Sequence, residues 1–553
     1  MMSAETARPG DEAFFLPPHE YLAALDDPGS APRRDLTEVY GGDKNLAAAA
    51  LPLYREVLTG FKKAFPGEES VAVMRSTGRV NLLGMHSDHR GGSINTIAVH
   101  ELLMAVSRRT DDRILIHNAD PDNFPPRQFS IAAELPAEPV KDWEAWTRAR
   151  YAERRQAGMA GDWSNYIKAP ALYIQDRLKA HGQPLLTGFN CFVTSNLPRA
   201  AGLSSSSALV VGTAETIIYM NGLSFTDSEF VDCCGTGEWF VGTRGGKGDH
   251  ASILFGRPAT VNHISFFPLG VEPLPFPAGH RVILCNSLVE AKKSAGARDV
   301  FNDRVCSYEV GLKLIKRHSS DLAPRLEHLR DLDPARLGLP DADVLQLIRE
   351  LPEIADRNEI RRLLPGEDDF LERLFDSHRE PAEGYRVRAV CLYGVAAISR
   401  SEVAADLLKK GDLKTFGQLM YLSHDGDRVT GIGPDGRRRP FAIDHSHGAL
   451  DIVIGNAREG AESAKVYRQP GGYAASVPEL DEIVDTTRNV PGVLGASVVG
   501  AGLGGNVIVL AREASVEELI DRLDQNFYGP RGVAPAVDVC YPLKGSGFLR
   551  TNA

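Results

Sequence analysis

The stretch LPRAAGLSSSSALVV, at residues 197–211, constrains the fold and the chemistry of this chain more than any other part of it. It follows the strand-like run FNCFVT and leads into an apolar pattern with helical spacing, and four serines lie between the two. Free backbone N–H groups at the start of a helix attract phosphate, and small residues let its oxygens approach the main chain. A flexible serine-rich linker would join polar segments instead. The stretch therefore predicts a phosphate-binding turn between a strand and a helix.

Composition argues against several classes of protein. With 553 residues, 43% of them hydrophobic and 24% charged, the chain is long enough for two globular domains. Its formal net charge of −11 argues against nucleic acid or an anionic membrane as the main partner, because both require a basic face. Seven cysteines without a CxxC spacing predict neither a disulfide framework nor a zinc site. Without a signal sequence or a membrane-spanning apolar run, we expect a cytoplasmic protein.

Periodicity assigns helices and strands along the chain and predicts the α+β class. The first 45 residues, rich in Pro, Asp, Gly and Ala, are expected to form a loosely ordered arm. Helical spacing predicts helices at residues 51–65, 165–179, 206–219, 227–241, 480–488 and 516–527. Strand patterns occur at residues 71–74, 80–83, 97–108, 113–117, 189–194, 281–285, 493–499, 507–510 and 537–541. The alternation after residue 480 suits a ferredoxin-like sheet with helices on one face.

Two further motifs accompany the serine-rich stretch. GRVNLLGMHSDHRGG occupies residues 78–92, and GVLGASVVGAGLGGNVIVL occupies residues 492–510. In this order the three motifs resemble those of the GHMP small-molecule kinases, most closely the galactokinase branch, and the resemblance runs from about residue 71 to about residue 549.

The resemblance implies a two-domain GHMP kinase fold with the active site between the domains. The N-terminal domain, at residues 46–275, is expected to be ribosomal-protein-S5-like, and the C-terminal domain, at residues 276–553, ferredoxin-like. Two stretches have no obvious galactokinase counterpart. We expect helical decoration or an oligomer surface near residues 317–381, and a long loop, ordered or mobile, near residues 430–470.

Three rival motifs are weaker. Residues 500–505 satisfy the dinucleotide pattern GxGxxG, but a strand follows them where that pattern requires a helix. Residues 242–248 approach a P-loop, which needs Ser or Thr after the lysine, whereas Gly248 follows Lys247. The sequence HSDH at residues 86–89 resembles a metallohydrolase element, but Gly84 stands where that element requires a further histidine.

The resemblance assigns the chemistry to Asp249 and Arg79. Asp249 aligns with the family's catalytic aspartate, which takes the proton of the sugar C1 hydroxyl. Arg79 aligns with the catalytic arginine, which lowers the pKa of that aspartate and stabilises the transferring phosphoryl group. Taken alone, Asp249 could also be a helix N-cap, and Arg79 a surface residue at a strand end.

The resemblance also implies sites for ATP and Mg²⁺. The residues expected to bind the ATP phosphates are Gly202, Leu203, Ser204, Ser205, Ser206, Ser207, Gly502 and Gly504. Ser206 matches the magnesium-binding serine, with Ser205 as the alternative because four consecutive serines leave the register open. The family's magnesium glutamate aligns with Gly237, one residue before Glu238. One residue rotates a helical side chain by about 100°, so Glu238 serves only if the helix is shifted or bulged.

Four residues are expected to bind the sugar: Met85, His86, Asp88 and Gly246. Met85 stands where galactokinases carry a glutamate that faces the C6 side of the sugar, and Thr77 replaces the usual proline. Residues 295–304 should contain a sugar-contacting tyrosine and have Phe301 instead. A methionine wall would favour a sugar that lacks the C6 hydroxyl or carries a different group there, such as a carboxylate bound by Arg90. The alternative is that another residue takes over the role of the glutamate.

The resemblance implies a kinase that uses ATP and Mg²⁺ to phosphorylate the anomeric hydroxyl of a monosaccharide, with galactose as the default substrate. One alternative is a related 1-kinase for L-arabinose, a uronic acid or an amino sugar. Another is a sugar- and ATP-binding sensor that has lost catalysis. The retention of Asp249 favours the enzyme, because a sensor needs no base. We expect a monomer or a homodimer.

Overall fold

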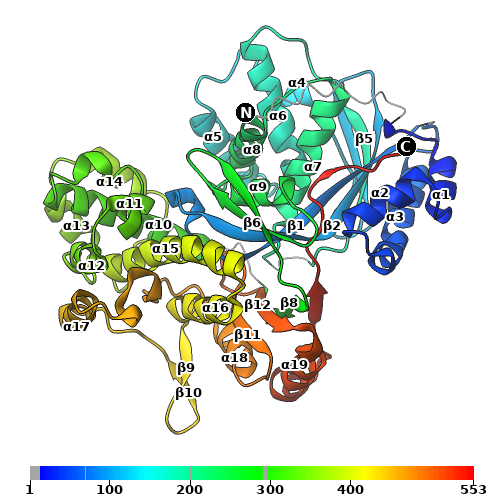
Figure 1. Cartoon of the computed structure of the whole chain (residues 1–553). Helices are drawn as coiled ribbons and strands as arrows, with labels where there is room; N and C mark the ends of the chain where they lie inside the picture. The colour runs from blue at the N-terminus through cyan, green and yellow to red at the C-terminus, as the bar shows by residue number, and fades with distance from the viewer. Residues whose placement is uncertain (1–12, 69, 199–201, 291–294, 553) are drawn as a thin grey trace.

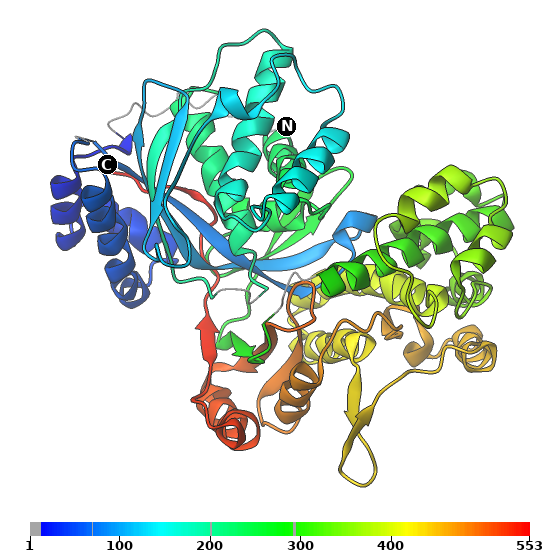
Figure 2. The same ribbon diagram turned by 180° about the vertical axis from the view of Figure 1, so that it is seen from behind.

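The structure is a computed structural model that describes residues 13–68, 70–198, 202–290 and 295–552 (Figure 1). It contains an eight-stranded sheet flanked by helices, a smaller four-stranded sheet, and a helical body beside them (Figures 1 and 2). The molecule is therefore α+β with two domains, as the periodicity and the resemblance predict. Within the described residues, no helix is both long enough and apolar enough to cross a membrane.

The eight-stranded sheet forms the N-terminal domain. Its strands are β1 (Ala72–Leu83), β2 (Ile94–Arg108), β3 (Arg113–Asn118), β4 (Arg127–Ser130), β5 (Phe189–Ser195), β6 (Thr260–Ser265), β7 (Gly270–Pro275) and β14 (Gly547–Phe548). Their order is β14-β1-β2-β5-β3-β4, with β6 paired to β2 and β7 to β6. Only β3 and β5 pair in parallel among these described strands. The strand patterns at residues 71–74 and 80–83 form one strand, β1, whose register shifts between Thr77 and Gly78.

Helices cover both faces of this sheet because its central strands are apolar on both sides. Met74 and Met104 pack with α6 (Ser164–Ala180) and α7 (Ser205–Met220), whereas the adjacent Val73 and Leu103 pack with α3 (Lys44–Ala64). Successive strand residues point to opposite faces, so each strand contributes to two separate cores. On the face covered by α6 and α7 lie four further helices: α4 (Ile131–Glu134), α5 (Trp143–Gln156), α8 (Asp227–Gly237) and α9 (Gly248–Leu254).

The expected loosely ordered arm is instead helical where the structure describes it. Helices α1 (Pro18–Asp26) and α2 (Ala31–Val39) pack beside α3 through Tyr21, Leu25 and Leu36, all of which are fully buried. The composition of this segment suggested disorder, but these three apolar side chains provide a core to pack on. Residues 1–12 of the expected arm lie outside the described residues.

The four-stranded sheet has the expected ferredoxin-like arrangement. It contains β8 (His280–Asn286), β11 (Val493–Val498), β12 (Asn506–Arg512) and β13 (Val537–Cys540) in the antiparallel order β11-β12-β8-β13. Helices α18 (Pro478–Thr487) and α19 (Val516–Leu523) pack on one face. On the other face, Leu284 and Ile508 pack with α16 (Leu413–Asp427) and join the core of the large sheet. The two domains therefore share one continuous apolar core.

The helical body is built on two long helices, α10 (Ala295–His318) and α15 (Val387–Lys410). The insertion near residues 317–381 is helical as expected. Its helices are α11 (Pro334–Leu337), α12 (Asp341–Arg349), α13 (Arg357–Leu363) and α14 (Asp368–Phe375). They share a core with α10 and α15, in which Leu345 and Ile360 are fully buried.

The insertion near residues 430–470 is more regular than the expected loop. It forms a projecting hairpin of β9 (Thr430–Ile432) and β10 (Arg438–Pro440), followed by helix α17 (His447–Arg458), as Figure 2 shows. The hairpin is held at its base, where the buried carboxylate of Asp481 accepts hydrogen bonds from the backbone N–H groups of Val429 and Thr430 at 3.1 and 2.7 Å.

All strands of the ferredoxin-like sheet lie after residue 275, where the domain boundary is expected, but the end of the chain pairs with the N-terminal sheet. After β13 the chain returns to the N-terminal domain, where β14 pairs with β1 and places Phe548 opposite Met74. The buried guanidinium of Arg75 donates hydrogen bonds to the carbonyls of Lys544 and Gly545. Strand pairing between such distant segments leaves no local signal in the sequence. A single domain boundary could therefore not predict that the end of the chain returns to the first domain.

Candidate active site

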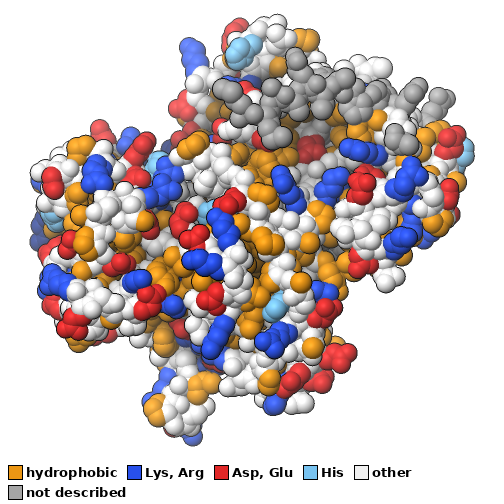
Figure 3. Space-filling model, viewed as in Figure 1, with side chains coloured by type: hydrophobic (Ala, Val, Ile, Leu, Met, Phe, Trp, Pro, Cys, Tyr) orange, Lys and Arg blue, Asp and Glu red, His pale blue; other side chains and the backbone are white. Residues whose placement is uncertain are grey.

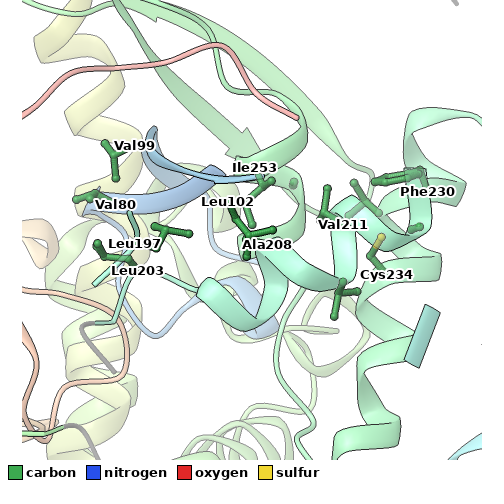
Figure 4. Close-up of a cluster of buried hydrophobic side chains, with 14 of the residues drawn as sticks. Val80, Val99, Leu102, Leu197, Leu203, Ala208, Val211, Phe230, Cys234 and Ile253 are labelled. Carbon is green, nitrogen blue, oxygen red and sulfur yellow. The ribbon is translucent and has the colours of Figure 1, made fainter. Parts of the chain in front are cut away.

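The serine loop, residues 202–207, follows β5 in the chain and includes the first turn of α7. Leu203, Ala208 and Val211 anchor it by pointing into a buried apolar cluster (Figure 4). Ser204 is the N-cap of α7 in a left-handed conformation, with φ 60°, and its hydroxyl makes no cap hydrogen bond. The first N–H groups of a helix have no partner within it. The loop therefore presents the amide groups and positive end of α7, as a phosphate site requires.

Arg79 and Asp249 meet beside this loop, although 170 residues separate them in the chain. Nε and Nη2 of Arg79 each lie 2.7 Å from Oδ1 of Asp249, and Nη1 donates to the carbonyl of Gly202 at 2.7 Å. The hydroxyl of Ser204 donates to the other carboxylate oxygen, Oδ2, at 2.5 Å. Asp249 is thus held between an arginine and a serine, and its side chain is still 34% exposed.

The surroundings of Asp249 favour its ionised form. Burial acts to raise its pKa, but the charge of Arg79 and the hydrogen bonds from Ser204 and Arg79 outweigh burial and lower the pKa below its usual value. The carboxylate is therefore a charged hydrogen-bond acceptor at neutral pH. Asp249 lies in the first turn of α9 but makes no cap hydrogen bond there, so the N-cap interpretation does not apply.

Asp88 and Gly246 lie against each other. A Cβ atom at Gly246 would be 1.9 Å from Oδ2 of Asp88, so any other residue at position 246 would displace this carboxylate. The N–H of Gly248 donates to the same oxygen at 3.3 Å, and Nδ1 of His89 lies 3.4 Å from Oδ1. Burial acts to raise the pKa of Asp88, but the contact with His89 and the backbone N–H groups lower it to about 2.

The side chains of His86 and Met85, both expected to contact the sugar, are buried. Met85 is 2% exposed within the apolar core. His86 has φ 57°, and this left-handed conformation places its ring on the buried Tyr473, with centroids 4.2 Å apart. Its Nε2 lies 3.6 Å from Oδ1 of the buried Asp427. Burial lowers the pKa of His86 to about 3 and raises that of Asp427 to about 7, so both are neutral at moderately acidic pH.

The magnesium residues expected from the sequence are only partly brought together. Helix α8 ends at Gly237, and residues Glu238–Val241 form a 3-10 turn. This change of helix type turns the Glu238 side chain toward α7, where the hydroxyl of Ser207, not of Ser206, lies 3.2 Å from Oε2. Nε2 of His250 lies 2.7 Å from the same oxygen. Among the described residues, no group of three or more His, Cys, Asp or Glu side chains forms a metal site.

The glycine turn of the third motif joins β11 to β12, which agrees with the rejection of a dinucleotide fold. A Cβ atom at Gly500 would be 3.1 Å from the carbonyl oxygen of Gly202, so this turn lies against the serine loop. Gly502 and Gly504 both have positive φ, and a Cβ at Gly502 would be 2.1 Å from the carbonyl of Ala475. The turn and the serine loop are therefore neighbours, as the resemblance implies.

Three contacts at the site were not predicted from the sequence: Ser204 with Asp249, His89 with Asp88, and His250 with Glu238. His89 and His250 directly follow expected site residues, Asp88 and Asp249, which was the one available signal. Phe301, expected in place of a sugar-contacting tyrosine, lies with its ring centroid 5.9 Å from that of His89. Arg90 pairs with Glu309 and lies over Tyr308, so it is already engaged within the protein.

Comparisons with known proteins agree with this geometry. Three family models match: the GHMP kinases N terminal domain at residues 165–257, the GHMP kinases C terminal domain at residues 447–529, and the galactokinase galactose-binding signature at residues 59–109. The chain is 24% identical to a galactokinase of Roseiflexus sp. (strain RS-1) over 482 residues, which cover 87% of this chain and 94% of the relative. It is also 24% identical to a galactokinase of Dictyostelium discoideum over 483 residues, 86% of this chain and 88% of that one.

A solved structure, Lactococcus lactis galactokinase complexed with galactose, shares the fold. It superposes with a TM-score of 0.59 and 19% sequence identity, over 89% of this chain and 99% of the other. The two kinase domains, the galactose-binding signature and the shared fold agree with the three motifs and the pairing of Arg79 with Asp249. The chain therefore has the N-terminal and C-terminal domains of the GHMP kinases together with the galactose-binding signature of the galactokinases.

Proposed function

We propose that this protein is a sugar kinase that transfers the γ-phosphoryl group of ATP to the anomeric hydroxyl of a monosaccharide. The observation that carries the proposal is the position of Asp249, which Arg79 and Ser204 hold beside the N-terminal end of α7. Phosphoryl transfer requires charge neutralisation and a residue that orients and deprotonates the acceptor hydroxyl. Asp249 takes the second role, and Arg79 with the serine loop takes the first.

Asp88 and Gly246 would hold the acceptor. The Asp88 carboxylate, which stays ionised because its pKa is about 2, can accept hydrogen bonds from ring hydroxyls. Gly246 lets the chain approach closely, because a side chain there would meet Asp88. The ring would then lie between Asp88 and Asp249, with its anomeric hydroxyl toward Asp249.

The residues near the serine loop fit a magnesium ion. Mg²⁺ prefers oxygen ligands such as carboxylates and phosphate oxygens, and Glu238 and the loop hydroxyls supply oxygens. Both contacts to Glu238 converge on Oε2, and none of the described residues donates a hydrogen bond to Oε1. Glu238, with Ser206 or Ser207, would therefore hold the ion, which neutralises phosphate charge when bound.

Two sugars are the leading substrates. Galactose is the first, since the relatives are galactokinases and the galactose-binding signature matches residues 59–109. L-arabinose, which lacks the C6 group of galactose, is the second, because Met85 is buried in the core and His86 faces Tyr473. A uronic acid is less well supported, because Arg90 is paired with Glu309.

The test is a screen of the purified protein with ATP and a panel of free sugars and sugar acids, with products identified by ³¹P NMR. We expect an anomeric sugar phosphate from galactose, L-arabinose or both, and almost none from the Asp249→Asn variant. No product from any sugar, with ATP and sugar still bound, would contradict the proposal and support a sensor instead.

A further inference from the structure

The carboxylate of Glu238 is held by side chains from two other elements. His250, from α9, and Ser207, from α7, lie 2.7 and 3.2 Å from the same oxygen, Oε2. We propose that His250 is a positioning residue that fixes Glu238 in the orientation required by the divalent metal of the nucleotide complex. The inference rests on the function proposed above, because it needs a metal–nucleotide site at the serine loop.

Position 237, which aligns with the family's glutamate, is closely packed here. A Cβ atom at Gly237 would be 3.1 Å from the carbonyl oxygen of Ala169 and 3.4 Å from Cα of Pro170, both on α6. A glutamate at this position would therefore extend into the packing between α8 and α6. The carboxylate near the serine loop comes from Glu238 instead, at the start of the 3-10 turn.

Glu238 would be poorly fixed without a further partner, because glutamate has several rotatable bonds and residue 238 lies at a change of helix type. His250 supplies that partner from a rigid position, since it is only 2% exposed. A carboxylate can only accept, so Nε2 of His250 carries the hydrogen and donates it to Glu238. Nδ1 of His250 is buried without a hydrogen-bond partner within the described residues, so Glu238 is the one group to which the ring is hydrogen-bonded there.

The hydrogen bond also links Glu238, the proposed metal ligand, to the helix that carries Asp249. His250 directly follows Asp249 on α9, a helix of seven residues. The same short helix therefore presents Asp249 to the acceptor and holds Glu238 near the phosphates. Because Oε2 is occupied by His250 and Ser207, Oε1 is the oxygen left for a metal ion.

Calorimetric titration with ADP, with Mg²⁺ or with EDTA, tests the inference independently of turnover. Mutation of a residue that hydrogen-bonds to a metal ligand typically lowers the metal affinity ten- to a hundredfold. We expect wild type to bind ADP more tightly with Mg²⁺ than with EDTA. In His250→Leu, the increase in ADP affinity on adding Mg²⁺ should be smaller than in wild type by about tenfold or more. The affinity for metal-free ADP should be unchanged.

Two amide variants separate positioning from packing. His250→Gln places an amide N–H near the position of Nε2 and should retain most of the Mg²⁺ gain. His250→Asn places its amide near Nδ1, cannot reach Glu238, and should lose the gain like His250→Leu. The matched control is Ser252→Ala, also buried on α9, whose hydroxyl donates to the carbonyl of Gly248 at 2.6 Å and does not contact Glu238.

Each outcome supports or contradicts the positioning role of His250. An unchanged Mg²⁺ gain in His250→Leu, or equal losses in the Gln and Asn variants, overturns the inference and leaves the proposed kinase intact. Wild type that binds no ADP, or binds it equally with and without Mg²⁺, overturns the metal–nucleotide site itself. If His250→Leu does not fold, as judged by thermal unfolding, the contrast between the Gln and Asn variants decides.

Discussion

The Gly246→Ala substitution tests the sugar site most directly. The added Cβ would lie 1.9 Å from Oδ2 and 2.5 Å from Cγ of Asp88, whereas non-bonded Cβ contacts are essentially never shorter than 3.0 Å. The Asp88 carboxylate therefore has to move by about 1 Å or more to reach ordinary contact distance. Gly246 does not have positive φ, so the substitution adds no comparable backbone strain.

The displaced carboxylate should lose its hydrogen bond from the N–H of Gly248 and the bond that it offers to the sugar. Hydrogen bonds to charged groups contribute about 1.5–3 kcal/mol. Loss of one such bond to the substrate corresponds to about a ten- to 150-fold weaker sugar affinity. The effect on ATP should be small, because the serine loop belongs to different elements.

Steady-state kinetics with galactose or L-arabinose measures both effects. We expect the sugar KM of Gly246→Ala to rise by about ten- to 150-fold, with the ATP KM within about twofold of wild type. The matched control is Gly245→Ala, because a Cβ atom at this neighbouring position has no atom within 4 Å. If both variants have the sugar KM of wild type, Asp88 does not hold the sugar. If the sugar KM rises equally in both variants, the cause is the flexibility of the glycine segment and not the contact with Asp88.

Three further predictions concern other residues. Asp249→Asn keeps the side-chain size but removes the base, so kcat should fall by about 10² to 10⁴ while ADP still binds in calorimetry; activity within a few-fold of wild type would make Asp249 structural. The Ser205→Ala and Ser206→Ala double variant should raise the ATP KM by about tenfold or more with an unchanged melting temperature, because neither hydroxyl has a partner among the described residues; unchanged kinetics would place the phosphates elsewhere. Burial raises the pKa of Asp427 to about 7, so the stability that its proton contributes is present at low pH and is lost as pH rises through about 7. The free energy of unfolding, from urea titrations between about pH 5 and 7, should therefore fall more steeply with pH in wild type than in Asp427→Asn, and equal slopes would contradict this.

Local patterns predicted much of the fold. The serine-rich stretch was correctly predicted as a strand, a turn and a helix, and the alternation after residue 480 correctly predicted the ferredoxin-like sheet. Both depend on periodicities of 2 and 3.6 residues, which a single sequence displays. The resemblance also brought together Arg79 and Asp249, which no local pattern connects.

The rest depended on long-range contacts and backbone conformation. The direction of the His86 ring follows from its left-handed φ and from the face of Tyr473, which lies in a distant loop. The contact between Glu238 and His250 depends on where α8 ends, and helix ends are the least predictable boundaries. Helices α1 and α2 form because they can pack on α3, which composition alone does not indicate.

The return of β14 to β1 has a consequence for how the chain folds during synthesis. The segment around β14 comes after the whole ferredoxin-like sheet in the chain, yet it completes the edge of the N-terminal sheet. Domains generally fold as units in the order in which the ribosome makes them. Here the first domain stays incomplete, with Arg75 lacking the Lys544 and Gly545 carbonyls, until the second domain has been made. Synthesis of the C-terminal domain is thus a prerequisite for finishing the N-terminal one, and the two become native together.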